Sequence, residues 1–308
     1  MSLLSGFIAQ LLHTALIAAA APTLVGVLSR MQAGLSGHVG PPPLQPWRDL
    51  LRLRRKQPLH AESASLVTGQ APFACAAATA VAASLVPSFT LGMLFAPLAD
   101  LLLIFGLLMA ARCSLALAAM DAGTASGGIA ASRVMLLGCL VEPVLLLVML
   151  AAALMAGSLN LDLVTAMQQE GDWQIGSALA LAALLVVALI DTAHREGLAD
   201  QLSGPDLALV EASAAVRLLV WFNLIGAMFL PFGMAPAGTA SPSAWVVGVL
   251  CWLGRTLLFT AVIAAVTTVI GRISLERAAK ALGVAILLGL LATGILFAQA
   301  GLANAGAA

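Results

Sequence analysis

Hydrophobic positions along this chain run continuously and do not alternate with polar ones. Long, predominantly apolar stretches recur, separated by shorter polar segments. About 20 helical residues cross the roughly 30 Å hydrocarbon core of a bilayer. The pattern therefore predicts an all-α polytopic membrane protein, with residues 1–308 forming a single integral membrane domain of eight spans. We expect the spans at residues 3–29, 70–91, 93–119, 134–157, 175–193, 208–232, 244–269 and 280–300.

Composition supports this class. Of the 308 residues, 61% are hydrophobic and only 9% are charged, whereas soluble domains carry about 25% charged residues.

The division between the second and third spans is the least sharply marked. Pro87 and Pro97 bracket it, and Ser88 and Thr90 are its only polar residues.

Cysteines and histidines are scattered singly along the chain. There is no Cys-x-x-Cys pair and no Cys/His cluster, the groupings that a zinc or iron–sulfur site would need. We therefore expect no metal, prosthetic group or catalytic centre in this chain. Each cysteine is interpreted as a small buried hydrophobic residue.

The basic residues of the loops all fall in one set of loops. With the N-terminus outside, the cytoplasmic loops are 30–69, 120–133, 194–207 and 270–279, as the positive-inside rule requires. The opposite loops contain no Lys or Arg, and the 158–174 loop is purely acidic. Both termini are then predicted outside. The basic residues of the cytoplasmic loops are Arg30, Arg48, Arg52, Arg54, Arg55, Lys56, Arg133, Arg195, Arg272 and Arg277.

The first cytoplasmic loop contains two distinctive pieces. Its three consecutive prolines, 41–43, predict a stiff polyproline stub. The following run LQPWRDLLRLRRK has helical spacing and predicts a short interfacial amphipathic helix. The alternative is a solvated loop whose charges only set the orientation. The predicted apolar side consists of Leu44, Trp47, Leu50, Leu51 and Leu53.

Several ionisable residues fall inside the predicted spans, where charges are costly and mark function. The carboxylates are Asp100, Glu142, Asp191 and Glu211, and the arginines are Arg112, Arg217 and Arg255, with Arg133 at the start of the fourth span.

Burial favours the protonated form of a carboxyl group unless an arginine is near, so this set indicates a proton relay. Glu142 lies about 13 Å along the helix from Arg133, and we expect it to be well buried. Pro143 beside it would kink the helix and make room for water. The alternative is a buried ion pair, such as Glu142 with Arg217 or Arg255, that holds two helices in register.

The 191–211 segment forms an acidic cytoplasmic loop. Its carboxylates lead from the cytoplasm into the fifth and sixth spans. Asp206 and Glu211 have a second interpretation, because acidic residues in the first turns of a helix favour its dipole. The loop's candidate pathway residues are Asp191, Asp200, Asp206 and Glu211.

Two motifs coincide with a known family. The run GPPPLQPWRDLLRLRRK resembles the first cytoplasmic loop of the respiratory complex I subunit 1 family. The run from Ala111 to Arg133 resembles the third-span exit of that family's branch in membrane-bound group 4 [NiFe] hydrogenases and formate hydrogenlyase. The absence of tyrosine favours this branch over complex I itself. The chain departs from the family pattern in two places. Val134 stands directly after the Ser-Arg pair, where the family usually has Glu, and Val216 and Arg217 stand soon after Glu211, where the family often has a carboxylate. The matching residues are Gln32, Gly40, Pro41, Leu44, Gln45, Pro46, Asp49 and Lys56, then Arg112, Asp121, Gly123, Gly128, Ser132 and Arg133.

The resemblance implies a membrane anchor and proton-coupling subunit in a bacterial or archaeal cytoplasmic membrane. Its partners would be a [NiFe] large subunit, iron–sulfur subunits and antiporter-like membrane subunits, with the [NiFe] centre and the clusters held by the partners. A quinone is compatible with the resemblance but is not indicated, and no nucleic-acid partner is expected. Docking to the hydrophilic module falls to Gln32, Gly40, Pro41, Gln45, Pro46, Asp49 and Lys56. The proton pathway comprises Asp100, Glu142, Asp191, Asp200, Asp206 and Glu211, with the charge partners Arg112, Arg133, Arg217 and Arg255.

Three alternatives stay open at this point. The first is the quinone-site membrane subunit of a complex I-type NADH–quinone oxidoreductase. The second is a stand-alone secondary transporter, which should show an internal repeat or broken helices; the sequence has neither. The third is a structural anchor without a proton path.

Overall fold

The computed structural model describes residues 3–59, 64–171, 175–193, 198–238, 241–271 and 274–306, and within these ranges it contains helices and no strands. The helices are α1 (Leu3–Leu35), α2 (Gln45–Arg54), α3 (Leu66–Leu85), the 3-10 helix η1 (Ala96–Leu98), α4 (Leu101–Asp121), α5 (Ala125–Ala156), α6 (Leu161–Glu170), α7 (Ile175–Ala193), α8 (Gly204–Phe229), α9 (Pro242–Ile270) and α10 (Leu275–Gly306). All of them except α2, α6 and η1 are long and apolar enough to cross a membrane, which makes eight spans. The predicted fold class and span count are confirmed.

Helix α8 lies at the centre of the bundle. It packs against α1, α2, α3, α6, α7 and α9, and every residue from Arg217 to Phe229 is buried. Aromatic side chains fill the space around it. Trp221 stacks on Phe105 of α4 at a ring-centroid distance of 6.4 Å, and Phe222 meets Phe259 of α9 at 5.7 Å. Such a dense apolar layer positions the polar residues of α8 that lie closer to its start.

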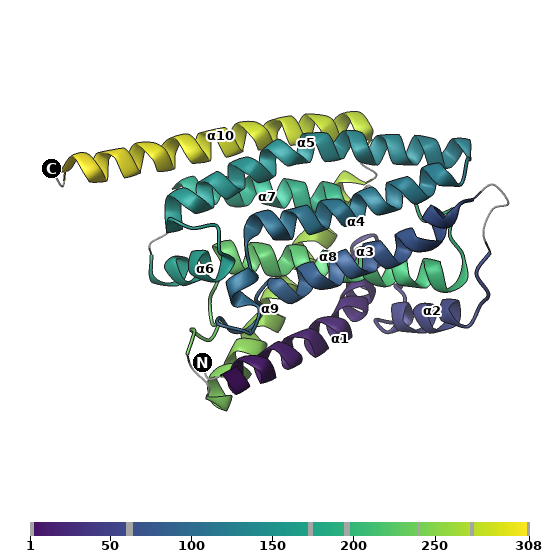
Figure 1. Ribbon diagram of the computed structural model, residues 1–308, viewed down its shortest axis with the longest axis horizontal. Helices are drawn as coiled ribbons and strands as arrows, with labels where there is room; N and C mark the ends of the chain where they lie inside the picture. The colour runs from purple at the N-terminus through teal and green to yellow at the C-terminus, as the bar shows by residue number, and fades with distance from the viewer. Residues whose placement is uncertain are drawn as a thin grey trace.

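The two ends of the bundle differ. Figure 1 shows both chain termini at the left end, while α2 lies at the right end. Both termini lie at the same end because the number of spans is even. Helix α10 packs along α5 and α7 and forms the upper edge of the bundle in this view.

Several predicted boundaries are wrong. Helix α5 begins at Ala125, not at residue 134, because Thr124 caps it: its Oγ1 accepts from the Gly127 N–H at 3.1 Å. The predicted 120–133 loop is thereby reduced to a short turn, and Arg133 lies within the helix. The predicted 158–174 loop contains α6, whose N-cap Asn160 accepts from the N–H groups of Asp162 and Leu163.

The connection between the second and third spans is longer than predicted. Helix α3 ends at Leu85 and α4 begins at Leu101. Between them the chain forms bends, a turn and the 3-10 helix η1, and residues 89–91 pair with residues near 235. The Leu91 N–H donates to the Ala235 carbonyl at 3.0 Å, and the Ala235 N–H donates to the Phe89 carbonyl at 2.9 Å. These bonds satisfy backbone groups that are buried away from water, where an unpaired group would be costly.

The predicted amphipathic helix exists as α2 and packs against α1 and α8. Trp47, Leu50 and Leu53 are half-buried, but Leu44 and Leu51 are exposed. The predicted apolar side was therefore too broad, since Leu51 follows Leu50 by 100° around the helix.

The segment 36–59 that carries α2 is fastened at both ends by its own chain. At one end, Gly26 of α1 lies so close to Pro43 that an added Cβ would meet the Pro43 carbonyl. At the other end, the Leu59 N–H donates to Ser203 Oγ at 2.7 Å, and Gly204 packs on the backbone of Gln57.

Candidate functional site, a buried charge cluster

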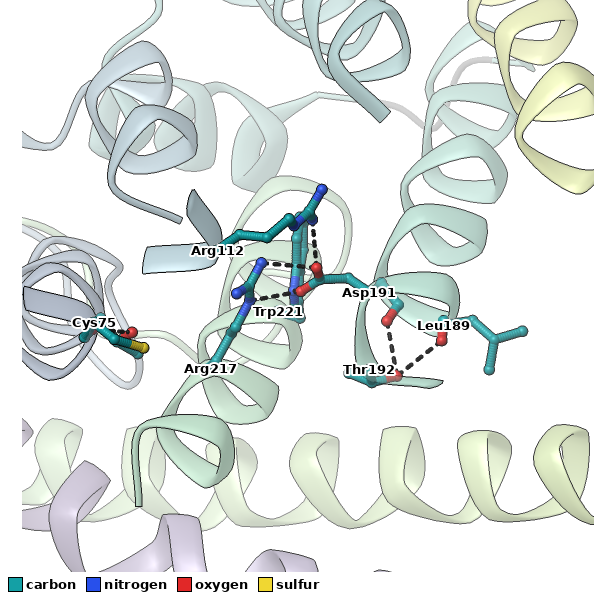
Figure 2. Close-up of polar contacts among 9 residues, drawn as sticks. Cys75, Arg112, Leu189, Asp191, Thr192, Arg217 and Trp221 are labelled. Atoms are coloured by element: carbon teal, nitrogen blue, oxygen red, sulfur yellow. Dashed lines mark hydrogen bonds and ion pairs between the residues drawn. The ribbon is translucent and has the colours of Figure 1, made fainter. Parts of the chain in front are cut away.

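Three spans bring four polar side chains together in the interior. Arg112 comes from the middle of α4 and Asp191 from the last turn of α7. Arg217 and Trp221 come from α8, where a spacing of four residues places them on the same face. Figure 2 shows the two guanidinium groups and the indole converging on the Asp191 carboxylate.

Asp191 accepts hydrogen bonds from all three partners. Arg217 grips both carboxylate oxygens, with Nε 2.6 Å from Oδ2 and Nη2 2.7 Å from Oδ1. The Trp221 Nε1–H donates to Oδ2 at 2.8 Å, and Arg112 Nη2 donates to Oδ1. A bidentate arginine–carboxylate pair of this kind is among the strongest hydrogen-bonded contacts in proteins.

Because the cluster is buried, its charged members depend on one another for charge compensation. The side chains of Asp191, Arg217 and Arg112 are only 3%, 6% and 8% exposed. Removing one member of a buried ion pair leaves an uncompensated charge and costs about 3–5 kcal/mol. The cluster thus joins α4, α7 and α8 through a carboxylate that two cations share.

Two cavities flank the cluster. A small one of about 20 Å³ is lined by Arg112, Asp191 and Arg217, and this volume is sufficient for about one water molecule. A larger one of about 620 Å³ lies beneath α2. Arg217, Leu115 and Leu198 line both cavities, so they adjoin. The polar and charged lining of the larger cavity consists of Asp49, Arg52, Thr79, Thr192, Glu211, Ser213 and Arg217.

The remaining acidic-loop residues differ in exposure, and one of them lines the larger cavity. Glu211 is exposed and faces the larger cavity, two turns before Arg217 on α8. Asp206 is buried in the first turn of α8, and Asp200 is exposed between α7 and α8. The structure thus brings Asp191, Arg112 and Arg217 into contact and places Glu211 at the cavity that leads to them.

Other predicted members lie apart from the cluster. Asp100 is the N-cap of α4, where it accepts from the Leu102 N–H at 2.7 Å. Arg255 donates to the carbonyls of Leu230 and Ser88 at 2.9 and 2.8 Å, and more weakly to Gly226. Arg133 is exposed on α5.

The predicted burial of Glu142 is wrong. Its depth along α5 is as expected, but its side chain is exposed on the outward face of the helix. It makes no hydrogen bond or ion pair with any residue that the structure describes. The suggested ion pairs of Glu142 with Arg217 or Arg255 are therefore absent: Arg217 binds Asp191, and Arg255 binds carbonyl oxygens.

Sequence reasoning missed Trp221, whose indole is the third donor to Asp191. The available signal was its position one turn after Arg217. His13, which the sequence left unassigned, bonds to Ser88 Oγ at 2.7 Å and to the Ala83 carbonyl at 2.9 Å and joins α1 to the end of α3.

The predicted docking residues differ in their surroundings. Gln32 lies in α1 and donates to Thr267 Oγ1 of α9 at 2.8 Å, so it joins two spans. Gly40 packs on the backbone of Arg30 and holds the 36–59 segment to α1. Gln45 donates to Asp49, which also pairs with Arg52 at 3.3 Å. Pro46 lines the larger cavity, while Pro41 and Lys56 are exposed.

Arg195 and Arg272, two of the basic residues of the predicted cytoplasmic loops, lie outside the described residues. Within the described ranges there is no group of three or more His, Cys, Asp or Glu side chains that could hold a metal ion.

Comparison with known proteins assigns the chain to a family. The family model for NADH dehydrogenase matches residues 8–299, nearly the whole sequence. The chain belongs to the NADH dehydrogenase family. The match confirms the predicted resemblance of this NADH dehydrogenase family member to the complex I subunit 1 family.

Two curated proteins of Escherichia coli (strain K12) are similar to this family member. Hydrogenase-4 component C is 30% identical over 228 residues, which cover 70% of this chain and 72% of that protein. Formate hydrogenlyase subunit 4 is 28% identical over 246 residues, which cover 75% and 80%.

The fold is also similar to a solved structure. A chain of the membrane-bound sulfane sulfur reductase, an archaeal respiratory membrane complex, superposes with a TM-score of 0.80 at 18% identity. The match covers 94% of this chain and 99% of that one. It confirms the architecture of the bundle.

Proposed function

We propose that this chain is the membrane anchor and proton-coupling subunit of a multi-subunit membrane-bound [NiFe] hydrogenase of the formate hydrogenlyase or hydrogenase-4 type. Similarity to subunits of those two systems supports the class of complex. The observation that carries the coupling role is the Asp191 cluster, because it adjoins a cavity that α2 covers.

The partners in this proposal are a [NiFe] large subunit, iron–sulfur subunits and antiporter-like membrane subunits. The metal centres belong to the partners, and this chain supplies only side chains and shape. It lies in a bacterial or archaeal cytoplasmic membrane with both termini outside and α2 on the cytoplasmic side.

Coupling would operate through the shared carboxylate. A hydrophilic module bound over the 36–59 segment can shift α2, which lines the same cavity as Glu211 and Arg217. A small displacement of α8 would change how firmly Arg217 holds Asp191. A carboxylate that loses a cationic partner binds a proton more readily. The cluster is thus a two-state element that redox events can bias.

The first test is purification through a tag on this subunit in mild detergent, followed by mass spectrometry and metal analysis. Nickel, iron–sulfur proteins and antiporter-like subunits should co-purify. The second step measures proton translocation by that complex in vesicles. Glu211→Gln should lower it several-fold while hydrogenase activity with an artificial electron carrier persists.

The control is Glu170→Gln, which neutralises an exposed carboxylate on α6. Intact proton translocation with both Glu211→Gln and Glu142→Gln would eliminate the pathway and leave a structural anchor.

A second candidate function is favoured by the size of the larger cavity. Its volume of about 620 Å³ falls within the roughly 300–1,000 Å³ of small-molecule sites. It suits the membrane subunit of a complex I-type oxidoreductase that reduces a quinone. Recovery of a flavin- and NADH-linked module, with quinone reductase activity, would select this function in place of the first.

A further inference from the structure

Between residues 136 and 150, the outward face of α5 carries one carboxylate in an otherwise apolar surface. Leu136, Cys139, Glu142, Leu146 and Leu150 recur every three or four residues and are all exposed. We call them the α5 stripe. Helices α4, α7 and α10 pack on the other sides of α5, and Figure 1 shows α5 beside α10 in the upper part of the bundle.

Glu142 lies far from both ends of its helix. It follows Ala125 by 17 residues and precedes Ala156 by 14, or about 25 and 21 Å at 1.5 Å per residue. Its side chain is too short to reach either headgroup layer. The leucines on either side of it, Leu136 and Leu146, are 50% and 58% exposed. A lipid-facing stripe would therefore place this carboxylate in hydrocarbon, at a cost of several kcal/mol.

A second acceptor accompanies the carboxylate. In a regular helix the N–H of residue 143 would donate to the Cys139 carbonyl, but residue 143 is proline and has no N–H. Cys139 is itself a member of the α5 stripe. Polar backbone groups in a bilayer require a partner within protein, so the stripe presents two acceptors, Glu142 and the Cys139 carbonyl, less than one turn apart.

We propose that the α5 stripe docks a transmembrane helix of a partner membrane subunit, and that this helix presents a lysine or arginine to Glu142. Such a side chain carries several donors and can serve both acceptors at once. A second copy of this chain in a two-fold contact is a poor occupant, since it would bring one Glu142 carboxylate toward another. The proposal rests on the proposed function, in which the chain works among other membrane subunits.

Site-specific photo-crosslinking in native membranes tests what covers the stripe. Benzoylphenylalanine replaces Leu146, and in a matched variant it replaces Leu290 of α10, which is 52% exposed. The Leu290 position sets the background from random collisions. We expect a protein adduct from position 146, well above that background, with a membrane subunit whose cross-linked helix contains a lysine or arginine. A yield at position 146 no higher than the background overturns the proposal.

Substitution of Glu142 tests the charge. Glu142→Leu gives the stripe the same apolar residue as its neighbours. If a partner cation pairs with Glu142, the loss leaves that cation unpaired, and recovery of the membrane partner should fall on the order of tenfold. Leu150→Met, which keeps the face apolar, should leave recovery unchanged. If the stripe faces lipid, Glu142→Leu will not reduce recovery and will raise the yield of the chain, which overturns the proposal.

The wild-type purification separates the two levels of inference. If hydrogenase, iron–sulfur and membrane partners all co-purify, but position 146 gives only background and Glu142→Leu has no effect, the proposed function stands and the α5 interface falls. A wild-type chain that is recovered alone overturns both.

Discussion

The Asp191 carboxylate accepts hydrogen bonds from arginines of two different helices. Arg217 takes both of its oxygens from α8, while Arg112 reaches one of them from α4. Arg217 stands where the resemblance leads one to expect a carboxylate, and it instead supplies the cation that compensates Asp191.

Asp191→Asn should be severely destabilising. The amide retains one acceptor but turns an N–H₂ donor toward guanidinium groups, and two cations lose their counter-charge. We expect a loss of about 3–5 kcal/mol, measured as thermal unfolding of the purified complex and as accumulation in membranes. Trp221→Phe removes only one donor and should cost less, about 1.5–3 kcal/mol. Equal stability of Asp191→Asn and wild type would show that the carboxylate is not charged in the folded protein.

Asp162 predicts a pH dependence at the opposite end of the bundle. It lies in α6, outside the spanning helices, where burial raises the pKa of its carboxyl group above 3.8, while the hydrogen bond from the Gly92 N–H opposes the shift. The folded state therefore binds the proton more tightly, and stability falls as the pH rises from 3.8 through the raised pKa.

Asp162→Asn removes this penalty and keeps an acceptor for Gly92. Its melting temperature should match that of wild type at acidic pH and exceed it at neutral pH. Glu170→Gln, at an exposed site on the same helix, should show no such difference. An Asp162→Asn variant that melts below wild type at neutral pH would contradict the assignment.

At the residue scale, sequence identified the polar residues of the cluster but not their pairing. Arg112, Asp191 and Arg217 are conspicuous as charges within apolar runs. Which of them meet depends on the rotation of α4, α7 and α8 about their axes. In a membrane the outward face of a helix is as apolar as the inward face, so the hydrophobic pattern carries no signal of rotation. The same ambiguity explains why Glu142 was wrongly predicted to be buried.

At the element scale, the spans were found but their ends were not. Helices α1 and α5 have 33 and 32 residues, more than the roughly 20 that cross the hydrocarbon. Hydropathy locates the part of a helix that crosses the hydrocarbon. It does not locate the ends of the helix, which are set by capping residues. Thr124 and Asn160 are such caps, and they account for the missed start of α5 and for the missed helix α6.

Gly26→Ala should disturb the docking segment. A Cβ at this position would meet the Pro43 carbonyl, so the polyproline stub and α2 must move outward. We expect a several-fold loss of hydrophilic subunits on purification. Gly34→Ala lies on the same helix with no atom within 4 Å of the added carbon, and it should behave as wild type. Full recovery of the hydrophilic subunits with Gly26→Ala would show that this contact does not position the docking segment.

At the scale of the whole molecule, the eight spans separate two chemically different ends. The end that bears α2 contains the basic segment and both cavity-lining charges of α2, Asp49 and Arg52. The other end contains α6 and the chain termini. Sequence predicted this asymmetry well, because loop charge is a property of composition and does not depend on helix rotation.

Sidedness can be measured with two surface cysteines. Gln57→Cys and Glu170→Cys lie at exposed positions near opposite ends of the bundle. A membrane-impermeant maleimide should label the first only in inside-out vesicles and the second only in right-side-out ones. Labelling of both from one side would refute the topology, and labelling with the opposite preference would invert it.

The fastening of residues 36–59 by Gly26, Ser203 and Gly204 bears on biogenesis. Because these contacts are made within one polypeptide, the surface at which the proposed hydrophilic module docks is complete as soon as α8 and the turn before it are inserted. If the proposed complex exists, this chain should fold without waiting for its hydrophilic partners. A cell that lacks those partners should still accumulate the chain as a folded intermediate.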